Sequence, residues 1–239
     1  MINETLRKFK KSVTLKYLIA TGRRTNIKPA VECPSVWYGN NYGGFYVNPE
    51  KLNDRSVVYS FGIGEDISFD LAVIKNHNCR VYGFDPTPKS IHWISTQQLP
   101  ANFSFNDYGI NVESGTVEFS LPVNQAHVSG SIVTHSALDD QHKIAVKMKS
   151  FADITTGYGH TYIDLLKMDI EGTEYAVIAS ILTGPAHVGQ FAIELHERFF
   201  DDGTARTKRF LEMLSDYGYS VFAVSESLEE ISLIRADKN

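Results

Sequence analysis

Titratable side chains follow two apolar segments in the C-terminal half of the chain. One apolar segment leads directly to Asp169 and Glu171, and another leads to Glu194 and His196. Residues two apart in an extended segment share one face, so each segment presents its two titratable groups together. If the two segments are neighbouring strands, three carboxylates and one imidazole meet in one crevice.

Two kinds of chemistry suit this set of groups. With an ordinary pKa of about 6.5, His196 could accept a proton from a hydroxyl while a carboxylate orients its ring. Alternatively, Asp169, Glu171, Glu194 and His196 could hold a hard divalent cation such as Mg²⁺, which lowers the pKa of a bound hydroxyl. The simpler interpretation is that the first two acids cap the next helix, while His196 and Glu197 form surface ion pairs. Titratable groups that gather in a crevice mark sites, so we interpret these four residues as catalytic and as candidate metal ligands.

A glycine turn lies earlier in the chain, between two apolar segments. Gly62 and Gly64 follow the segment Val57–Phe61, and neither carries a Cβ that would keep a ligand away from the backbone. The next apolar segment ends in Asp85, whose carboxylate can accept hydrogen bonds from a ribose diol. A strand, a glycine turn that opens a helix, and a strand that ends in a carboxylate form the layout of Rossmann-like nucleoside sites. The pattern therefore predicts a nucleoside cofactor.

The residues beside the glycine turn bear on which cofactor is bound. A dinucleotide site usually has a third glycine where this chain has Ile67. Glu65 and Asp66 would also repel a pyrophosphate, whereas they suit an adenosyl cofactor that carries a sulfonium and an amino group. Alternatively, this acidic pair only caps the following helix, which the helix dipole favours.

Strand-like and helix-like segments alternate along most of the chain. Apolar runs typical of strands lie at 57–61, 80–84, 103–105, 144–149, 163–168, 190–195, 219–224 and 231–235. Patterns typical of helices lie at 66–76, 88–97, 172–182 and 204–217. We also expect a hairpin with its turn at Ser114–Gly115. Repeated strand–helix units predict an α/β fold with a mainly parallel, seven-stranded sheet and helices on both faces. The short link between the last two strands predicts an antiparallel C-terminal hairpin, which completes the Rossmann-like class I methyltransferase arrangement.

The first part of the chain differs in character from the rest. Residues 1–30 hold eight basic side chains and one acidic side chain, and apolar residues recur at helical spacing at Ile2, Leu6, Phe9, Val13 and Tyr17. Such a helix can dock on an anionic membrane surface or on a partner. The interpretation that we favour is that it packs its apolar stripe on its own domain. Residues 31–56 have the composition of a loop or short hairpin that can cover a cofactor site. We therefore divide the chain into a basic helix and loop extension, 1–50, and a catalytic domain, 51–239.

Composition excludes several classes of protein. The 239 residues carry a formal net charge of −5, which disfavours a general nucleic-acid binder. Cys33 and Cys79 form no CxxC motif, so neither a disulfide scaffold nor a zinc knuckle is indicated. No apolar run approaches the roughly 20 residues that span a bilayer. We expect a soluble, cytoplasmic protein without a transmembrane segment.

Several segments together resemble FkbM-type methyltransferases, in order and spacing, from about residue 55 to about residue 200. They are the segment 81–88, the expected hairpin before Phe119, the pair Gly130–Ser131, the Leu-Leu-Lys-Met-Asp-Ile-Glu-Gly segment 165–172 and the segment 193–196. The resemblance implies S-adenosylmethionine as cofactor and methyl transfer to an oxygen of a small molecule or glycan, often a hydroxyl of a sugar or a secondary metabolite.

The resemblance also implies roles for individual residues. It places Gly62, Gly64, Glu65, Asp66, Asp85, Asp107, Tyr108 and Asp169 around the cofactor. Asp107 and Tyr108 would flank the adenine, and Asp169 with Glu171 would lie at the reacting centre. Ser60 stands where an acidic residue is commoner, so Glu65 or Asp66 would supply the missing negative charge. Three alternatives remain open: a nicotinamide-dependent oxidoreductase, a nucleic-acid methyltransferase, which the acidic domain disfavours, and a non-catalytic cofactor-binding module.

Overall fold

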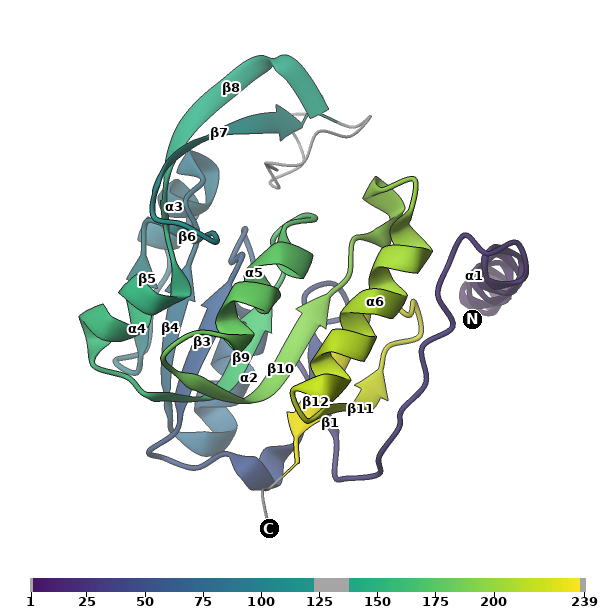
Figure 1. Ribbon diagram of the computed structural model, residues 1–239, viewed down its shortest axis with the longest axis horizontal. Helices are drawn as coiled ribbons and strands as arrows, with labels where there is room; N and C mark the ends of the chain where they lie inside the picture. Colours follow the sequence, from purple (N-terminus) through teal and green to yellow (C-terminus); the bar gives the residue numbers. More distant parts are fainter. Residues whose placement is uncertain (1, 123–137, 237–239) are drawn as a thin grey trace.

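The fold is built on a seven-stranded sheet, which the computed structural model shows with helices on both of its faces (Figure 1). The structure describes residues 2–122 and 138–236. The strand order is β11-β12-β10-β9-β3-β4-β5. The strands are β3 (Val57–Phe61), β4 (Arg80–Phe84), β5 (Phe103–Asn106), β9 (Tyr162–Met168), β10 (His187–Glu194), β11 (Tyr219–Val224) and β12 (Glu230–Arg235). All neighbours pair in parallel except β12, which is antiparallel to both β10 and β11. The predicted fold class is confirmed.

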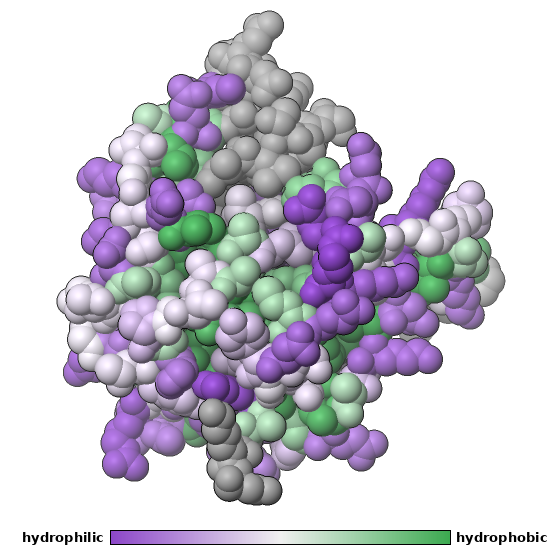
Figure 2. Space-filling model, viewed as in Figure 1, coloured by the Kyte–Doolittle hydropathy of each residue, from purple (hydrophilic) through white to green (hydrophobic). Residues whose placement is uncertain are grey.

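The two faces of the sheet carry separate hydrophobic cores. The helices are α2 (Ser68–His77), α3 (Pro88–Ser95), α4 (Phe151–Tyr158), α5 (Glu174–Leu182) and α6 (Gly203–Asp216). Side chains alternate along each strand, so Tyr59 and Leu166 meet α4, α5 and α6, while Val58 and Leu165 meet α2 and α3. On the face seen in Figure 2, hydrophilic residues gather over α6. Phe210 of α6 is buried in the core on this face of the sheet. Of these helices, α4 is the one that the sequence pattern does not predict.

A second, three-stranded sheet projects from one end of the main sheet (Figure 1). It is made of β6 (Gly109–Ile110), β7 (Gly115–Pro122) and β8 (Leu138–Lys149), with β7 antiparallel to β8. The predicted hairpin turn at Ser114–Gly115 is therefore wrong, because Gly115 begins a strand whose partner is β8. Ser114 instead accepts a hydrogen bond from the Ser150 amide at the start of α4 and donates one to Asp153. Gly130–Ser131 lies outside the described residues.

The N-terminal part contains helix α1 (Ile2–Ala20) and a hairpin of β1 (Val36–Tyr38) and β2 (Phe45–Val47), as the sequence predicts. The hairpin packs on the main sheet, with Phe45 and Val47 buried in the same core as α2. In contrast, Val13 and Tyr17 of α1 are 50% and 59% exposed. The interpretation that α1 buries its stripe on its own domain is therefore wrong at these two residues, and docking on a membrane or partner stays a prediction. Among the described residues, no helix is both long and apolar enough to cross a bilayer.

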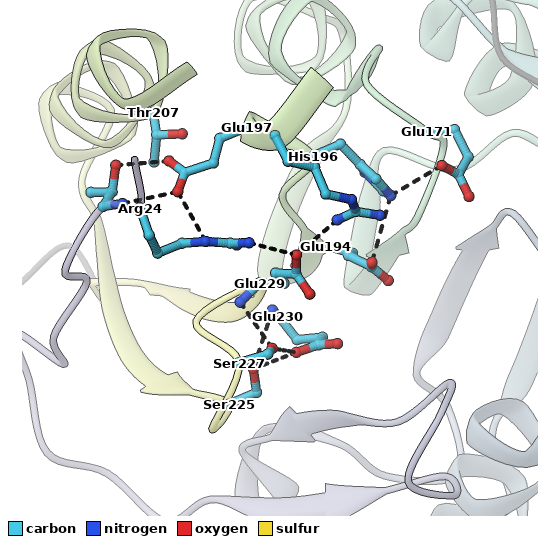
Figure 3. A network of polar contacts seen from close by, with 12 residues as sticks. Arg24, Glu171, Glu194, His196, Glu197, Thr207, Ser225, Ser227, Glu229 and Glu230 are labelled. Atoms are coloured by element: carbon cyan, nitrogen blue, oxygen red, sulfur yellow. Dashed lines mark hydrogen bonds and ion pairs between the residues drawn. The ribbon is translucent and has the colours of Figure 1, made fainter. Parts of the chain in front are cut away.

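The chain between α1 and the hairpin is anchored by Arg24, which forms ion pairs with two carboxylates. Arg24 Nη2 donates to Glu229 Oε1 at 2.8 Å, and Arg24 Nε lies 3.3 Å from Glu197 Oε1 (Figure 3). Glu197 also accepts hydrogen bonds from the amide and the hydroxyl of Thr25. Glu197 directly follows His196, so this anchor fixes the backbone beside a candidate site residue. It also excludes the simple surface ion pair expected for Glu197.

Replacing Arg24 with methionine is expected to lower the free energy of unfolding by about 3 kcal/mol, because the buried Glu197 carboxylate loses its cation. The measurement is urea unfolding, followed by circular dichroism. Arg23→Met is the matched control, since Arg23 is exposed. Equal midpoints for the two variants would show that the Arg24 contact does not stabilise the fold.

Candidate functional site

A cavity of about 470 Å³ lies at the carboxyl ends of β3, β4 and β9. The strand order reverses between β3 and β9, and ligands of open α/β sheets bind at such switch points. The cavity wall is made of the turn 62–66, the segment 85–87, the segment 169–171 and the loop 40–43, together with apolar residues of the second sheet. The predicted glycine turn and the predicted acidic strand end thus share one cavity.

The glycine turn has the backbone that its sequence predicts. Gly62 and Gly64 have φ values of +78° and +56°, which residues with a Cβ rarely adopt. The Gly62 amide donates to the Phe84 carbonyl at 3.0 Å. A Cβ on Gly62 would lie 1.7 Å from the Asp169 carbonyl oxygen, so only glycine fits. The turn and the acidic strand end are therefore in direct backbone contact.

Asp85 is buried at the end of β4 and shapes the turn. Its Oδ2 accepts a hydrogen bond from the Gly64 amide at 2.8 Å, and its Oδ1 accepts from the amide and hydroxyl of Thr87. Burial raises the pKa of Asp85, and the bonds from Thr87 and Gly64 oppose this rise. A carboxylate has about four acceptor positions, so the three bonds leave one for a ribose hydroxyl.

Glu65 and Asp66 line the cavity, but both have partners in the protein. Glu65 lies 3.3 Å from the Lys89 ammonium. Asp66 accepts from the Ser68 amide in the first turn of α2 at 2.8 Å and from the Asn40 side-chain amide at 2.7 Å. The capping interpretation therefore fits Asp66, which also holds the loop 40–43 at the mouth of the cavity.

Asp107 and Tyr108 do not line the cavity. Asp107 is exposed, and the ring of Tyr108 lies under the Lys149 ammonium, 4.3 Å from the ring centroid. The neighbouring Gly109 and Ile110 form this part of the wall instead. The resemblance implied Asp107 and Tyr108 at the cavity, but the structure places the next two residues, Gly109 and Ile110, in its wall.

The acidic strand ends converge on His196, as the sequence predicts (Figure 3). His196 Nε2 lies 3.7 Å from Asp169 Oδ1, 3.4 Å from Glu171 Oε2 and 3.5 Å from Glu194 Oε1. One ligand atom from each of Asp169, Glu171 and His196 falls within 4.8 Å of the others. Three of the four predicted metal ligands are therefore placed to share a cation, with Glu194 beside them.

A fifth residue, Glu174, fixes the orientation of the imidazole. Glu174 Oε1 accepts from His196 Nδ1 at 2.7 Å and from the His196 amide at 2.9 Å, and its Oε2 accepts from the Gly172 amide. Both Glu174 and His196 are buried. With Nδ1 directed at Glu174, Nε2 must face the other three carboxylates, in the arrangement that commonly orients a metal-binding histidine.

Glu171 has a strained backbone. Its φ of +53° lies in the left-handed region, where a residue with a side chain is unfavourable. Strain of this kind persists where the surrounding structure requires it and is common at functional sites. Here it turns the Glu171 carboxylate toward His196 Nε2.

The charges around His196 alter two pKa values. Burial alone would lower the pKa of His196, but Glu174, Asp169 and Glu194 outweigh this and raise it from 6.5 to about 10. Burial and the nearby Asp169 charge raise the pKa of Glu194 from 4.5 to about 8. Without a cation the imidazole is therefore charged at neutral pH and balances part of the carboxylate charge.

The metal-free protein is expected to lose thermal stability as the pH rises from 6.5 to 10. Across this range the folded protein keeps a proton on His196 that the unfolded chain has lost, and a rise in pH then favours unfolding. Glu194 also lowers the stability as the pH rises, but between about pH 4.5 and 8, because its pKa is raised from 4.5 to about 8. The measurement is the Tm in EDTA across the range. His196→Asn should flatten the curve, and an equally steep fall in that variant would exclude His196 as the cause.

Three further residues that line the cavity carry no clear signal in the sequence: Tyr42, Asp70 and Lys167. Lys167 lies inside an apolar strand, where its ammonium donates to the Gly62 carbonyl at 2.5 Å. Asp70 lies in the first turn of α2, where an acid normally serves the helix dipole. Tyr42 is 84% exposed in the loop over the acidic strand ends. Only the composition of 31–56 suggests that a loop covers the site.

A seven-stranded sheet in this order, with a glycine turn and a strand-end carboxylate at its switch point, defines a Rossmann-like methyltransferase fold. The model of the methyltransferase FkbM domain family matches residues 43–221, and the chain belongs to this family.

Two relatives in sequence are also named as methyltransferase-like proteins. The chain is 26% identical over 146 residues to the probable methyltransferase-like protein 24 of Homo sapiens, a match that covers 60% of this chain and 33% of that protein. The Rattus norvegicus protein of the same name is 25% identical over 141 residues, with 58% and 32% covered. The chain thus spans about a third of the length of these relatives.

Solved structures resemble the chain at low sequence identity. A fibrillarin pre-rRNA processing protein of Methanococcus jannaschii matches with a TM-score of 0.45 and 12% identity, over 90% of this chain and 88% of that chain. Aeropyrum pernix fibrillarin, with natively bound S-adenosyl-L-methionine, matches with a TM-score of 0.41 and 12% identity, over 87% and 84%.

Proposed function

We propose that the chain transfers a methyl group from S-adenosylmethionine to a hydroxyl oxygen of a small-molecule or glycan acceptor. One observation carries this proposal. The nucleoside-type turn at Gly62 and the carboxylate–imidazole cluster at Asp169 line one cavity, and their backbones touch. A cofactor held by the turn would therefore lie directly beside groups that handle a hydroxyl proton.

The charge of the cavity supports a cationic cofactor. Among the described residues that line it, the acidic ones outnumber the single basic one, Lys167; they are Glu65, Asp66, Asp70, Asp85, Asp169 and Glu171. A pyrophosphate would be repelled by this field, whereas a sulfonium would be attracted. This favours S-adenosylmethionine over a nicotinamide dinucleotide.

Methyl transfer from a sulfonium is an in-line displacement. The acceptor oxygen forms a bond to the methyl carbon as the carbon–sulfur bond breaks, and the hydroxyl proton leaves. Asp169 and Glu171 are the cluster members that line the cavity, so they accept the hydrogen bond of the hydroxyl and orient its oxygen. Asp169 and Glu171 take the leaving proton, and the charged His196 imidazole, whose Nε2 lies within 3.7 Å of both carboxylates, holds them in place.

The same donor set fits a divalent cation. Asp169, Glu171 and His196 would hold it, with Glu194 beside them. When bound, such a cation lowers the pKa of a coordinated hydroxyl. Imidazole is a better ligand for transition metals than for Mg²⁺, so the mixed nitrogen and oxygen set favours Mn²⁺ or Zn²⁺.

Tyr42 supports an acceptor that has a flat apolar face, such as a sugar ring. It is highly exposed, and it lines the same cavity as Asp169 and Glu171. The loop that carries it is held by Asn40, which bonds to Asp66 at 2.7 Å. An exposed aromatic ring in the cavity wall suits stacking against a ring-shaped acceptor.

Calorimetric titration with S-adenosylmethionine and, separately, with NAD⁺ tests the cofactor. We expect binding of the first alone. Incubation with the methyl-labelled cofactor and a panel of saccharides and hydroxylated small molecules then tests the reaction, in EDTA and with Mn²⁺ or Mg²⁺. Label transfer that Mn²⁺ restores better than Mg²⁺ would support the full proposal. Binding of NAD⁺ alone would favour an oxidoreductase, and tight cofactor binding without transfer would favour a non-catalytic module.

A further inference from the structure

Asp70 is a buried acid in the wall of the cavity that the proposed reaction does not use. It lies in the first turn of α2, its side chain is 2% exposed, and it lines the cavity. Its Oδ1 has no hydrogen-bond partner among the described residues, and neither has the Oγ of the buried Ser60 beside it. Leaving such atoms unpaired is unfavourable, so a ligand group that pairs with them would bind well.

The nearby cation does not satisfy Asp70. Lys167 Nζ donates to the carbonyl oxygens of Gly62 and Phe61, at 2.5 and 3.3 Å. Burial raises the pKa of Asp70 from 3.8 to about 6, and the charge of Lys167 together with the Ser60 hydroxyl only partly opposes this rise. The positive charge of Lys167 therefore stabilises the Asp70 carboxylate, but Lys167 donates no hydrogen bond to it.

The other acids near the glycine turn are engaged. Glu65 pairs with Lys89, Asp66 bonds to Asn40 and Ser68, and Asp85 bonds to Gly64 and Thr87. Among the described acids that line the cavity, Asp70 is the one with a buried, unpartnered carboxylate oxygen. It is thus the acid best placed to receive a new donor.

We propose that Asp70 binds the ammonium group at the amino-acid end of the cofactor, with the Ser60 hydroxyl beside it. The proposal rests on S-adenosylmethionine being the cofactor. Asp70 supplies the negative charge from the helix, while Ser60 lies behind it on β3, outside the cavity wall, where its hydroxyl lowers the pKa of Asp70. An ammonium offers three donors, one of which can pair with the unpartnered Oδ1 of Asp70.

Three ligands separate the parts of the cofactor. S-adenosylhomocysteine has the whole amino-acid end, decarboxylated S-adenosylmethionine keeps the ammonium but lacks the carboxylate, and 5′-methylthioadenosine lacks both. In Asp70→Asn, calorimetric Kd values should rise about 10- to 100-fold for the first two ligands, the loss expected for a hydrogen bond to a charged group. The Kd for 5′-methylthioadenosine should change less than threefold.

Two further variants keep the test decisive. Glu65→Gln removes one negative charge from the same wall, so it controls for general electrostatics. It should weaken the binding of the doubly charged decarboxylated S-adenosylmethionine, and it should change the Kd values of the two ligands without net charge, S-adenosylhomocysteine and 5′-methylthioadenosine, by one common factor. The double variant Ser60→Asp with Asp70→Ser returns the carboxylate to the strand and should recover part of the preference for ammonium-bearing ligands, even if Asp70→Asn folds poorly.

The outcomes separate this proposal from the proposed function. If the unaltered protein binds none of the three ligands, the cofactor assignment itself is wrong. If it binds them and Asp70→Asn weakens all three equally, or none, Asp70 does not bind the ammonium. A swapped variant that binds 5′-methylthioadenosine but shows no preference for the ammonium ligands would also overturn the proposal.

Discussion

His196→Asn is expected to lower kcat for methyl transfer about 10²- to 10⁴-fold, because it removes the charged imidazole that positions the proton-accepting carboxylates Asp169 and Glu171. Asparagine places an amide nitrogen near the position of Nδ1, so the bond to Glu174 Oε1, 2.7 Å long with histidine, can be kept. What the variant removes is Nε2, which faces Asp169, Glu171 and Glu194. The measurement is single-turnover transfer of labelled methyl to an acceptor that the unaltered protein methylates.

The control for this prediction separates chemistry from folding. His196 does not line the cavity, so the Kd for S-adenosylhomocysteine should stay within about threefold of the original value. Glu174→Gln weakens the support of the ring and leaves Nε2 in place, so it should cost less activity than His196→Asn. Full turnover by His196→Asn would remove His196 from the mechanism.

Gly62→Ala is expected to abolish measurable cofactor binding and to destabilise the fold by about 2 to 4 kcal/mol. Two effects add. The φ of +78° is unfavourable for alanine, and the new Cβ would lie 1.7 Å from the Asp169 carbonyl oxygen. Either the turn or the acidic strand end must shift, and both line the cavity. The measurements are urea unfolding and titration with S-adenosylmethionine.

Gly218→Ala is the matched control for the backbone strain. Gly218 has a φ of +84°, close to that of Gly62, but a Cβ there would have no neighbour within 4 Å. Gly218→Ala should therefore lower the free energy of unfolding by about 1 kcal/mol and leave cofactor binding unchanged. If the two variants were equally stable and equally able to bind, the close approach of Gly62 to Asp169 would have no consequence.

The sheet could be predicted because its strands carry local signals. β3 and β9 are short apolar runs that end in a glycine turn and in acids, and helix patterns lie between the strands. Parallel neighbours bring their carboxyl ends to one edge, so the meeting of Asp169 with His196 follows from topology alone. The same reasoning places Asp85 at the cavity.

The rest depends on contacts between distant parts of the chain. β7 pairs with β8, which lies much further along the chain than a tight turn can reach. The local Ser-Gly signal therefore predicted a hairpin with the wrong partner strand. Arg24 meets Glu197 and Glu229 from far along the chain, in a segment that continues to Ala30 and Val31, whose amides donate to the Val221 carbonyl of β11. Asp70 and Lys167 resemble an ordinary helix cap and an interruption of an apolar strand. The role of Asp70 and Lys167 depends on the groups that are buried beside them, and the types and spacing of residues in the sequence do not show these neighbours.

The position of β12 has a consequence for the order in which the protein can assemble. β12 is the last strand in the sequence, yet it lies between β10 and β11 in the sheet, and β11 pairs with no other described strand. During synthesis β11 leaves the ribosome first but has no strand of the main sheet to pair with until residues 230–235 have followed it. A nascent chain stopped after residue 221, where the family match ends, would therefore expose the bare edge of β10. β12 is thus the strand that joins β11 to the rest of the sheet.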